Sequence, residues 1–123
     1  MKEIEFIKKY IISFSSKKSG NISKYYDLPL VIFDKRDNKK NVLIIKTKKD
    51  FKNYFDNLFK ALLLLYGYQK TKIKKIKLIK KNSIISLNLL RINNKNKIIQ
   101  RLKCTYFLTE KKQKLIINGF IVE

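Results

Sequence analysis

The spacing of apolar residues changes at Gly67, and this change limits the folds that are open to the chain. Before Gly67, apolar residues recur at intervals of three and four, which predicts a helix over about residues 48–66. The members of this apolar stripe are Phe51, Phe55, Leu58, Leu62 and Leu65. Thr47 and Asp50 have the spacing of an N-terminal capping box, and Gly67 stands where a left-handed residue ends a helix.

After Gly67 the chain has the composition of β-strands, since it is rich in isoleucine and in alternating apolar positions. Four such segments follow one another, at about residues 69–80, 83–92, 98–109 and 114–122. Short polar stretches separate them, which predicts a meander of antiparallel strands. In the third segment, Cys104 and Tyr106 share the apolar face.

The chain before residue 48 predicts one more helix and a hairpin. Ile4, Ile7, Ile11 and Phe14 form a helical stripe over about residues 2–15, and a short helical turn follows at "NISKYY". Pro29 favours an extended chain before it. Residues 30–33 and 42–46 then flank the polar loop "DKRDNKKN", in which Asp34 and Asp37 are explained by turn chemistry.

The stretch "KTKIKKIKLIKK" at residues 70–81 has three interpretations. Isoleucines three residues apart fit a basic amphipathic helix on an anionic membrane. Lys72, Lys74, Lys75 and Lys77 are candidates for binding a polyanion such as nucleic acid. We favour the solvated face of a strand, because a bulge near Lys74 and Lys75 would put Ile73, Ile76 and Leu78 on one side. Membrane binding is not expected.

The formal net charge of +21 does not by itself establish a polyanion partner. Only three of the 30 basic residues are arginine, whereas selection for phosphate contacts favours arginine. A genome rich in A and T would enrich lysine, isoleucine and asparagine without any binding role, so nucleic acid is not the favoured partner. The 123 residues predict one domain, 1–123, with no signal peptide and no apolar run long enough to span a membrane. The single cysteine fits a reducing compartment, and we expect a cytoplasmic protein.

Three segments together resemble the nuclear transport factor 2-like superfamily, including its SnoaL-like branch. They are "YYDLPLVIF" after the first helix, "KTKKDFKNYFDNLFKALLLLYGY" and "RLKCTYFLTEKKQKLIINGFIV". The resemblance implies an α+β cone, in which a curved antiparallel sheet wraps around N-terminal helices and encloses a pocket. It also implies a homodimer formed through the sheet. The last strand here carries "KLIING" where many members have a tryptophan, so the resemblance does not identify the residue that forms the pocket floor.

The sequence excludes several kinds of catalytic chemistry. It contains no histidine, so a histidine base, a Ser–His or Cys–His nucleophile and a histidine-ligated metal are ruled out. Its three glycines form no phosphate-binding loop. We expect no cofactor and no metal. Cys104 is interpreted as a packed small apolar residue.

One acid and several tyrosines remain as candidate site residues. In the resembling family the chain enters the pocket rim near Asp27, where a carboxylate among tyrosines could act as a general base; a helix-ending role is the alternative. Tyr25, Tyr26, Tyr66 and Tyr106 are candidates for lining the pocket together with Cys104, or they are core aromatics. Tyr68 is open to the same two interpretations.

Three functions therefore remain. The favoured one is a dimeric domain that binds a small, partly apolar ligand or serves as an accessory subunit, without catalysis. The alternatives are an isomerase- or dehydratase-like enzyme that uses Asp27, and a non-specific polyanion binder.

Overall fold

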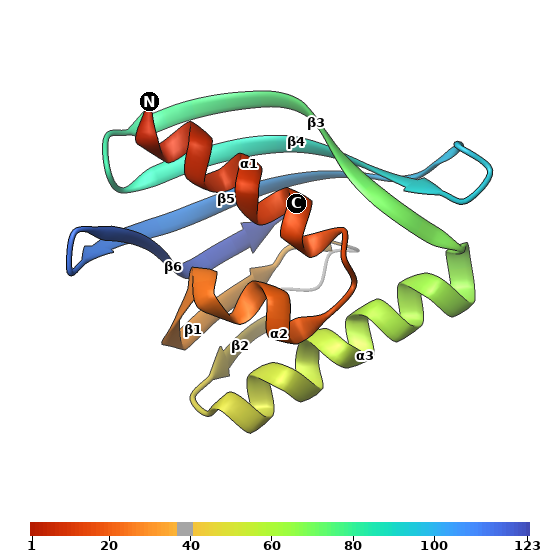
Figure 1. Ribbon diagram of the computed structural model, residues 1–123, viewed down its shortest axis with the longest axis horizontal. Helices are drawn as coiled ribbons and strands as arrows, with labels where there is room; N and C mark the ends of the chain where they lie inside the picture. Colours follow the sequence, from red (N-terminus) through yellow and green to blue (C-terminus); the bar gives the residue numbers. More distant parts are fainter. Residues whose placement is uncertain (37–40) are drawn as a thin grey trace.

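A six-stranded curved, unclosed sheet forms the body of the protein in the computed structural model, which describes residues 1–36 and 41–123 (Figure 1). The strands are β1 (Tyr26–Asp34), β2 (Asn41–Ile45), β3 (Tyr68–Lys80), β4 (Ile84–Asn93), β5 (Ile98–Lys111) and β6 (Lys114–Val122). The helices are α1 (Lys2–Phe14), α2 (Ser19–Ile22), the 3-10 turn η1 (Ser23–Tyr25) and α3 (Lys48–Tyr66). The predicted α+β class and the predicted order of elements are confirmed.

The sheet has the strand order β2-β1-β6-β5-β4-β3. Neighbouring strands are antiparallel except for β1 and β6, which run parallel, with Val31 opposite Gly119. The predicted hairpin is confirmed as β1 and β2, with Leu30 opposite Ile45, although β1 begins earlier than predicted, at Tyr26. Asp37, which was assigned to the hairpin loop, lies outside the described residues.

Helices α1 and α3 cover one face of the sheet, here called the inner face (Figure 1). The core forms where their apolar stripes meet the inward side chains of the strands. Ile7 and Tyr10 of α1, Phe55 of α3 and Leu87 of β4 are each at most 2% exposed. Burying such side chains contributes about 1.5–3 kcal/mol each, so this layer accounts for much of the stability.

Helix α3 begins and ends as predicted. The Thr47 hydroxyl accepts a hydrogen bond from the backbone N–H of Asp50 at 3.1 Å. Gly67 ends the helix with φ of 62°, a left-handed conformation that glycine adopts at little cost. The prediction that Leu65 belongs to the buried stripe is wrong, because its side chain is 71% exposed. Leu62 is the last buried residue of α3, and Phe59, one turn earlier, is buried as well.

The lysine-rich stretch forms β3, so the strand interpretation is confirmed. The pairing of β3 with β4 shifts between Ile73 and Lys75, at the predicted bulge. Ile73, Ile76 and Leu78 are packed against the core, whereas Ile79 is 54% exposed. Within the described residues, no helix combines the length and the apolar character that crossing a membrane requires.

Candidate functional site

A small cavity lies between the two long helices and the inner face of the sheet, with a volume of about 40 Å³. Helices α1 and α3 contribute Tyr10, Ile11, Phe14, Tyr54, Phe55 and Leu58. The chain just after β1 contributes Arg36, and strands β3 to β6 contribute Thr71, Leu89, Arg91, Cys104, Tyr106, Phe120 and Val122. Aromatic and aliphatic side chains therefore make up most of the wall.

Two of the buried tyrosines, Tyr10 and Tyr106, line the cavity, whereas the candidate Tyr26 lies behind Tyr10 and is not a lining residue. The hydroxyl groups of Tyr10 and Tyr26 are hydrogen-bonded to each other, and the rings of Tyr10 and Tyr106 meet edge to face at 5.7 Å. Burial raises the pKa of Tyr10, Tyr26 and Tyr106 above the usual tyrosine value. These hydroxyls are therefore neutral at physiological pH and can act as hydrogen-bond donors or acceptors.

Cys104 also lines the cavity, and it is buried as the sequence predicted. Burial raises the pKa of its thiol to about 11. A thiol in this state is a poor nucleophile, because the reactive form is the thiolate. The side chain therefore serves as an apolar part of the wall.

Arg36 reaches the cavity while it is paired with Asp34 at the end of β1. The Arg36 Nε–H and Nη2–H donate to the two carboxylate oxygens of Asp34, at 3.0 and 2.8 Å. The backbone N–H of Arg36 donates to the same carboxylate at 3.0 Å. These bonds lower the pKa of Asp34 and raise the pKa of Arg36, because each group stabilises the charged form of the other.

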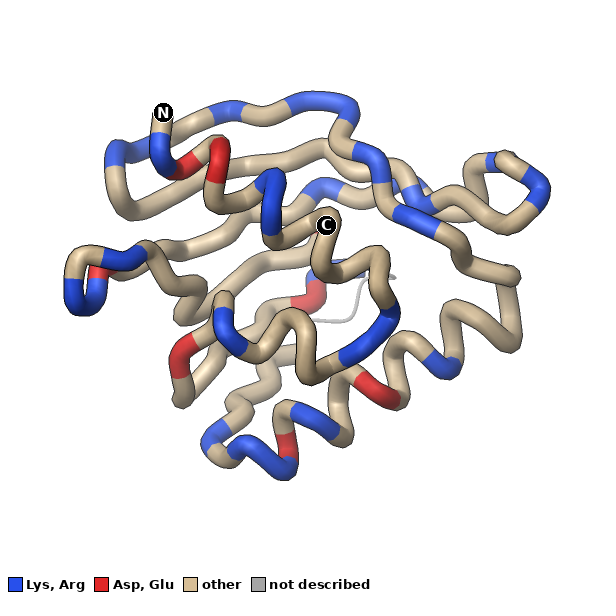
Figure 2. The backbone as a smooth tube through the Cα atoms, viewed as in Figure 1, with Lys and Arg blue, Asp and Glu red and all other residues tan. Residues whose placement is uncertain are grey.

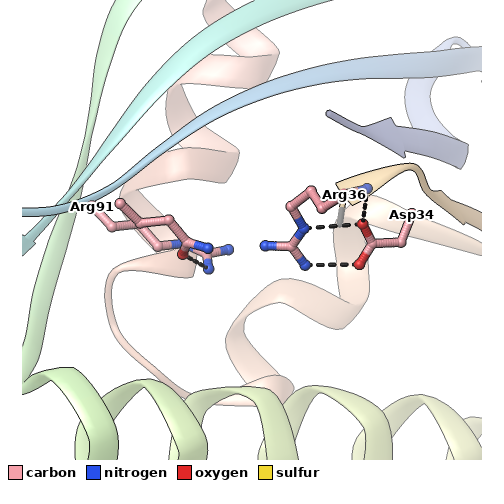
Figure 3. A network of polar contacts seen from close by, with 4 residues as sticks. Asp34, Arg36 and Arg91 are labelled. Carbon is pink, nitrogen blue, oxygen red and sulfur yellow. Dashed lines mark hydrogen bonds and ion pairs between the residues drawn. The ribbon is translucent and has the colours of Figure 1, made fainter. Parts of the chain in front are cut away.

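Arg91, on β4, points toward Arg36 from the other side (Figure 3). Its Nη1–H donates to the Gln100 side-chain oxygen at 2.8 Å, and its guanidinium lies 5.7 Å from the centre of the Phe14 ring. Burial lowers the pKa of Arg91. Within residues 1–36 and 41–123, no carboxylate forms a salt bridge with Arg91.

The other tyrosine candidates lie outside the cavity wall. Tyr25 is half-buried beside the cavity, with its hydroxyl 3.2 Å from the Ser13 hydroxyl and its ring 5.6 Å from that of Tyr10. Tyr66 is 50% exposed at the end of α3. Tyr68 is 1% exposed, and its hydroxyl bonds to that of Thr71 at 2.6 Å.

Asp27 lies at a separate hollow that includes Tyr26, Phe51 and Lys48, on the side of α2. Its carboxylate accepts a hydrogen bond from the backbone N–H of Leu28 at 3.0 Å and lies 3.4 Å from the Lys111 ammonium. Asp27 is therefore not among the residues that line the cavity with the two arginines.

The candidate lysines of β3 are exposed, and basic residues are spread over most of the molecule (Figure 2). Lys75 and Lys77 border a shallow hollow with Lys103 of β5 and Asn88 of β4. Lys74 borders a neighbouring hollow with Arg101 and Lys103. Lys72 does not line either hollow. Strand pairing thus gathers three of the four candidates with basic residues from β5.

A continuous apolar area lies on the outer face of the sheet, away from α1 and α3. Strand register places outward-facing residues of β2, β1, β6 and β5 side by side. This outer apolar patch consists of Val31, Phe33, Val42, Ile44, Phe107 and Ile121, around Gly119. A Cβ at Gly119 would lie 3.1 Å from the Val31 carbonyl oxygen, so only glycine fits without a shift. The patch carries no charged residue.

The sequence analysis missed Arg36, Arg91, Tyr10 and Tyr54 as residues of the site. One signal for the arginines was present, because arginine is so rare in this chain that each one is unusual. A second signal was the alternation in β4, where Arg91 falls on the same face as Leu87 and Leu89. Among the described residues, no group of three or more cysteine or acidic side chains could hold a metal ion.

The fold and the internal cavity define an α+β protein with a curved sheet that wraps around helices. No family model matches the chain, and no curated protein matches it in sequence. Solved structures share its fold. A protein of unknown function with a cystatin-like fold from Nostoc punctiforme is 11% identical, with 99% of this chain and 87% of that chain covered and a TM-score of 0.70.

Two NTF2-like proteins of unknown function are also similar. The one from Shewanella baltica is 15% identical, with 98% and 88% of the two chains covered and a TM-score of 0.58. The one from Shewanella oneidensis is 11% identical, with 98% and 95% covered and a TM-score of 0.61. The protein therefore has the nuclear transport factor 2-like fold, as its sequence predicted, and these likenesses concern the fold alone.

Proposed function

We propose that this protein is a dimeric domain that binds a small, partly apolar ligand in the cavity between α1, α3 and the sheet, without acting on it chemically. The observation that carries this proposal is the cavity wall, in which aromatic side chains surround a few polar groups. Such concave, mostly apolar sites with a few placed polar groups are typical of ligand pockets. The neutral tyrosine hydroxyls and the two arginines provide the polar contacts.

Native mass spectrometry of the protein purified from cells, at moderate salt, tests whether a ligand is present. We expect a discrete small-molecule adduct on the folded protein. A Leu58→Trp variant should lose the adduct, because the larger side chain fills the cavity from α3. Asn57→Trp is the matched control, since Asn57 is exposed on the same helix. An adduct that survives in Leu58→Trp, or that is absent from the wild type and cannot be added back, would contradict the proposal.

The outer apolar patch supports the dimeric part of the proposal. Val31, Val42 and Ile44 are 40–57% exposed, next to the partly buried rings of Phe33 and Phe107. Uncharged apolar faces of this kind are the usual core of an interface between copies of one chain. A twofold axis through the patch would cover it with the same patch of a second copy.

Sedimentation velocity tests the dimer. We expect Val31→Lys and Ile44→Lys to shift the protein from dimer to monomer, because each places a charge inside the buried patch. Ile79→Lys is the control, since Ile79 is exposed to a similar degree on β3, outside the patch. If the wild type is a monomer at tens of micromolar, or if all three variants stay dimeric, this part of the proposal is wrong.

Polyanion binding is the second candidate, because the fold gathers Lys74, Lys75 and Lys77 with Arg101 and Lys103 on the outer face. If these residues bind nucleic acid, affinity should fall steeply between 50 and 200 mM salt, by roughly 10³-fold for six phosphate contacts. Replacing Lys75, Lys77 and Lys103 together by glutamine should make the affinity for nucleic acid less dependent on salt. Absence of binding at physiological salt would remove this candidate.

The enzyme alternative depends on Asp27. An isomerase or dehydratase that uses this carboxylate as a base would bind its substrate at the hollow beside α2 rather than in the arginine-lined cavity. Asp27→Asn should then abolish turnover with little change in melting temperature. Turnover that persists in Asp27→Asn would exclude this role.

A further inference from the structure

The two arginines at the cavity have unused donors that face the same space. Arg36 uses its Nε and Nη2 groups for Asp34, and Arg91 uses Nη1 for Gln100. Each guanidinium has five N–H donors in a rigid plane, so both have donors left over. Figure 3 shows their tips pointing toward each other from opposite sides. An acceptor placed between them would receive hydrogen bonds from both.

The charges around the cavity leave an excess of one positive charge within the described residues. Asp34 neutralises Arg36 through a two-point ion pair with an Nη2–Oδ2 distance of 2.8 Å. Among the residues that the structure describes, the close partners of Arg91 are a neutral amide oxygen and the face of Phe14. A half-buried cation with neutral partners favours an anion that brings one negative charge. The lowered pKa of Arg91, caused by burial and by the charge of Arg36, agrees with an uncompensated positive charge at this site.

The remaining wall indicates what the rest of the ligand is like. Phe14, Phe55, Leu89 and Phe120 offer no polar group to a ligand, so the part that lies against them is apolar. The volume of about 40 Å³ is small. Since a single water needs roughly 10–15 Å³ by such a measure, the cavity admits about three or four water-sized groups. A short chain fits this space, and a large ring system does not.

We infer that the cavity binds a short organic monocarboxylate, whose carboxylate lies between Arg36 and Arg91 and whose apolar chain lies against Phe14, Phe55 and Leu89. This inference rests on the proposed ligand-binding function and adds the class of ligand. A carboxylate has two coplanar oxygens, which match the planar fork of each guanidinium. Its single negative charge balances the single excess charge, whereas a phosphate dianion would leave one negative charge uncompensated among aromatic side chains.

An NMR titration with propionate and propionamide tests the inference, because the two molecules have the same shape and differ in charge. The measured signals are the methyl groups of Leu58, Leu89 and Val122, which line the cavity. The titration is run at pH 7 and 0.15 M chloride. We expect propionate to shift these signals with at least tenfold higher affinity than propionamide. Inorganic phosphate, titrated in parallel, should leave them unchanged.

Variants of the chain's three arginines identify the source of the preference. Arg91→Gln and Arg36→Gln should each reduce propionate affinity at least tenfold, to the level of propionamide. Arg101→Gln removes the same charge from the surface and should have no effect, because Arg101 does not line the cavity. Arg91→Lys keeps the charge without the fork and serves as a second variant if Arg91→Gln fails to fold. Melting temperatures report whether each variant is folded.

The outcomes separate this inference from the proposal on which it rests. If propionamide binds as well as propionate and Arg91→Gln changes nothing, the carboxylate inference is wrong while the ligand-binding proposal stands. If phosphate binds more tightly than propionate through the same arginines, the site is for inorganic anions and the inference is also wrong. If neither organic probe shifts any cavity methyl, both the inference and the ligand-binding proposal fail.

Discussion

The Cys104 thiol is buried against the cavity, and its surroundings determine its reactivity. The pKa of this thiol rises from 9.0 to about 11. Because only the thiolate reacts with alkylating reagents, a rise of this size lowers the reactive fraction near pH 8 by about 100-fold. Burial of the sulfur also blocks access to it.

We therefore predict that iodoacetamide labels Cys104 of the folded protein at pH 8 at least about 100-fold more slowly than it labels the chain in denaturing urea. Mass spectrometry of quenched samples measures both rates, and a Cys104→Ser variant shows any labelling elsewhere. Equal rates with and without urea would mean that the thiol is accessible and that this wall of the cavity is open.

The Asp34–Arg36 pair makes stability depend on pH in the acid range. The pKa of Asp34 is lowered in the folded state by hydrogen bonds from Arg36, so the folded protein favours the carboxylate. Its contribution is present above the unfolded pKa of about 4 and is lost as pH falls through the lower folded pKa. We predict that the wild type loses more unfolding free energy between pH 5 and pH 2.5 than Asp34→Asn does.

Urea denaturation followed by circular dichroism at several pH values measures this difference. An Asp34→Asn/Arg36→Gln double variant serves as the comparison, since it should follow the same acid profile as Asp34→Asn alone. Parallel profiles for the wild type and Asp34→Asn would show that the ion pair does not stabilise the fold. The exposed fraction of the Asp34 side chain is 36%, so the expected effect is modest.

Helix α3 depends on its N-terminal cap, because two lysines in its first turn oppose the favourable charge of Asp50 in the same turn. The Thr47 hydroxyl is the side-chain acceptor for the N–H group of Asp50 in this turn. We predict that Thr47→Ala destabilises the protein by about 1 kcal/mol, and that Thr47→Ser keeps most of the stability. Urea denaturation at pH 7 measures both, and equal losses in the two variants would contradict the role of the hydroxyl.

The elements were predictable where their signals are local. The stripe that ends at Gly67 specified α3, and the spacing of isoleucines around Lys74 and Lys75 indicated the bulge in β3. The parallel pairing of β1 with β6 was not predictable, because nothing near Val31 in the sequence refers to Gly119. Leu65 was assigned to the core for a related reason. Helical spacing shows which residues share a face but not how far along the helix that face is covered, and in α3 burial stops at Leu62.

The candidate site was predictable only in part. Alternation along β5 correctly put Cys104 and Tyr106 on an inward face. Arg36 and Arg91 come from segments that are far apart in sequence, and they face each other only in the folded protein (Figure 3). Their individual spacing therefore gave no sign of a shared site, although their rarity among the basic residues did set them apart.

At the scale of the whole molecule, the net charge of +21 opposes the proposed dimer. Two such chains repel each other at low ionic strength, and salt screens this repulsion within about 10 Å at 0.1 M. The outer apolar patch itself is uncharged, so its attraction is not screened. We predict that the dimer becomes tighter as sodium chloride rises from 20 to 300 mM.

Sedimentation velocity over a concentration series at each salt measures the dissociation constant. The opposite trend, with dissociation as salt rises, would mean that charged groups stabilise the contact. The basic hollows beside Lys103 would then be the candidate interface. Repeating the series with the Ile44→Lys variant controls for salt effects on the monomer itself.

The pairing of β1 with β6 also sets the order in which the protein can assemble during its synthesis. The strand that holds Val31 leaves the ribosome well before its neighbour in the sheet, which holds Gly119. Until then one edge of β1 has no hydrogen-bonding partner from β6, and the inward ring of Phe120 is missing from the cavity wall. Until β6 emerges, α1 and the β1–β2 hairpin therefore belong to a partly folded chain whose apolar faces lack the cover that β6 provides. Because such a nascent chain exposes apolar surface, we expect molecular chaperones to bind it during synthesis.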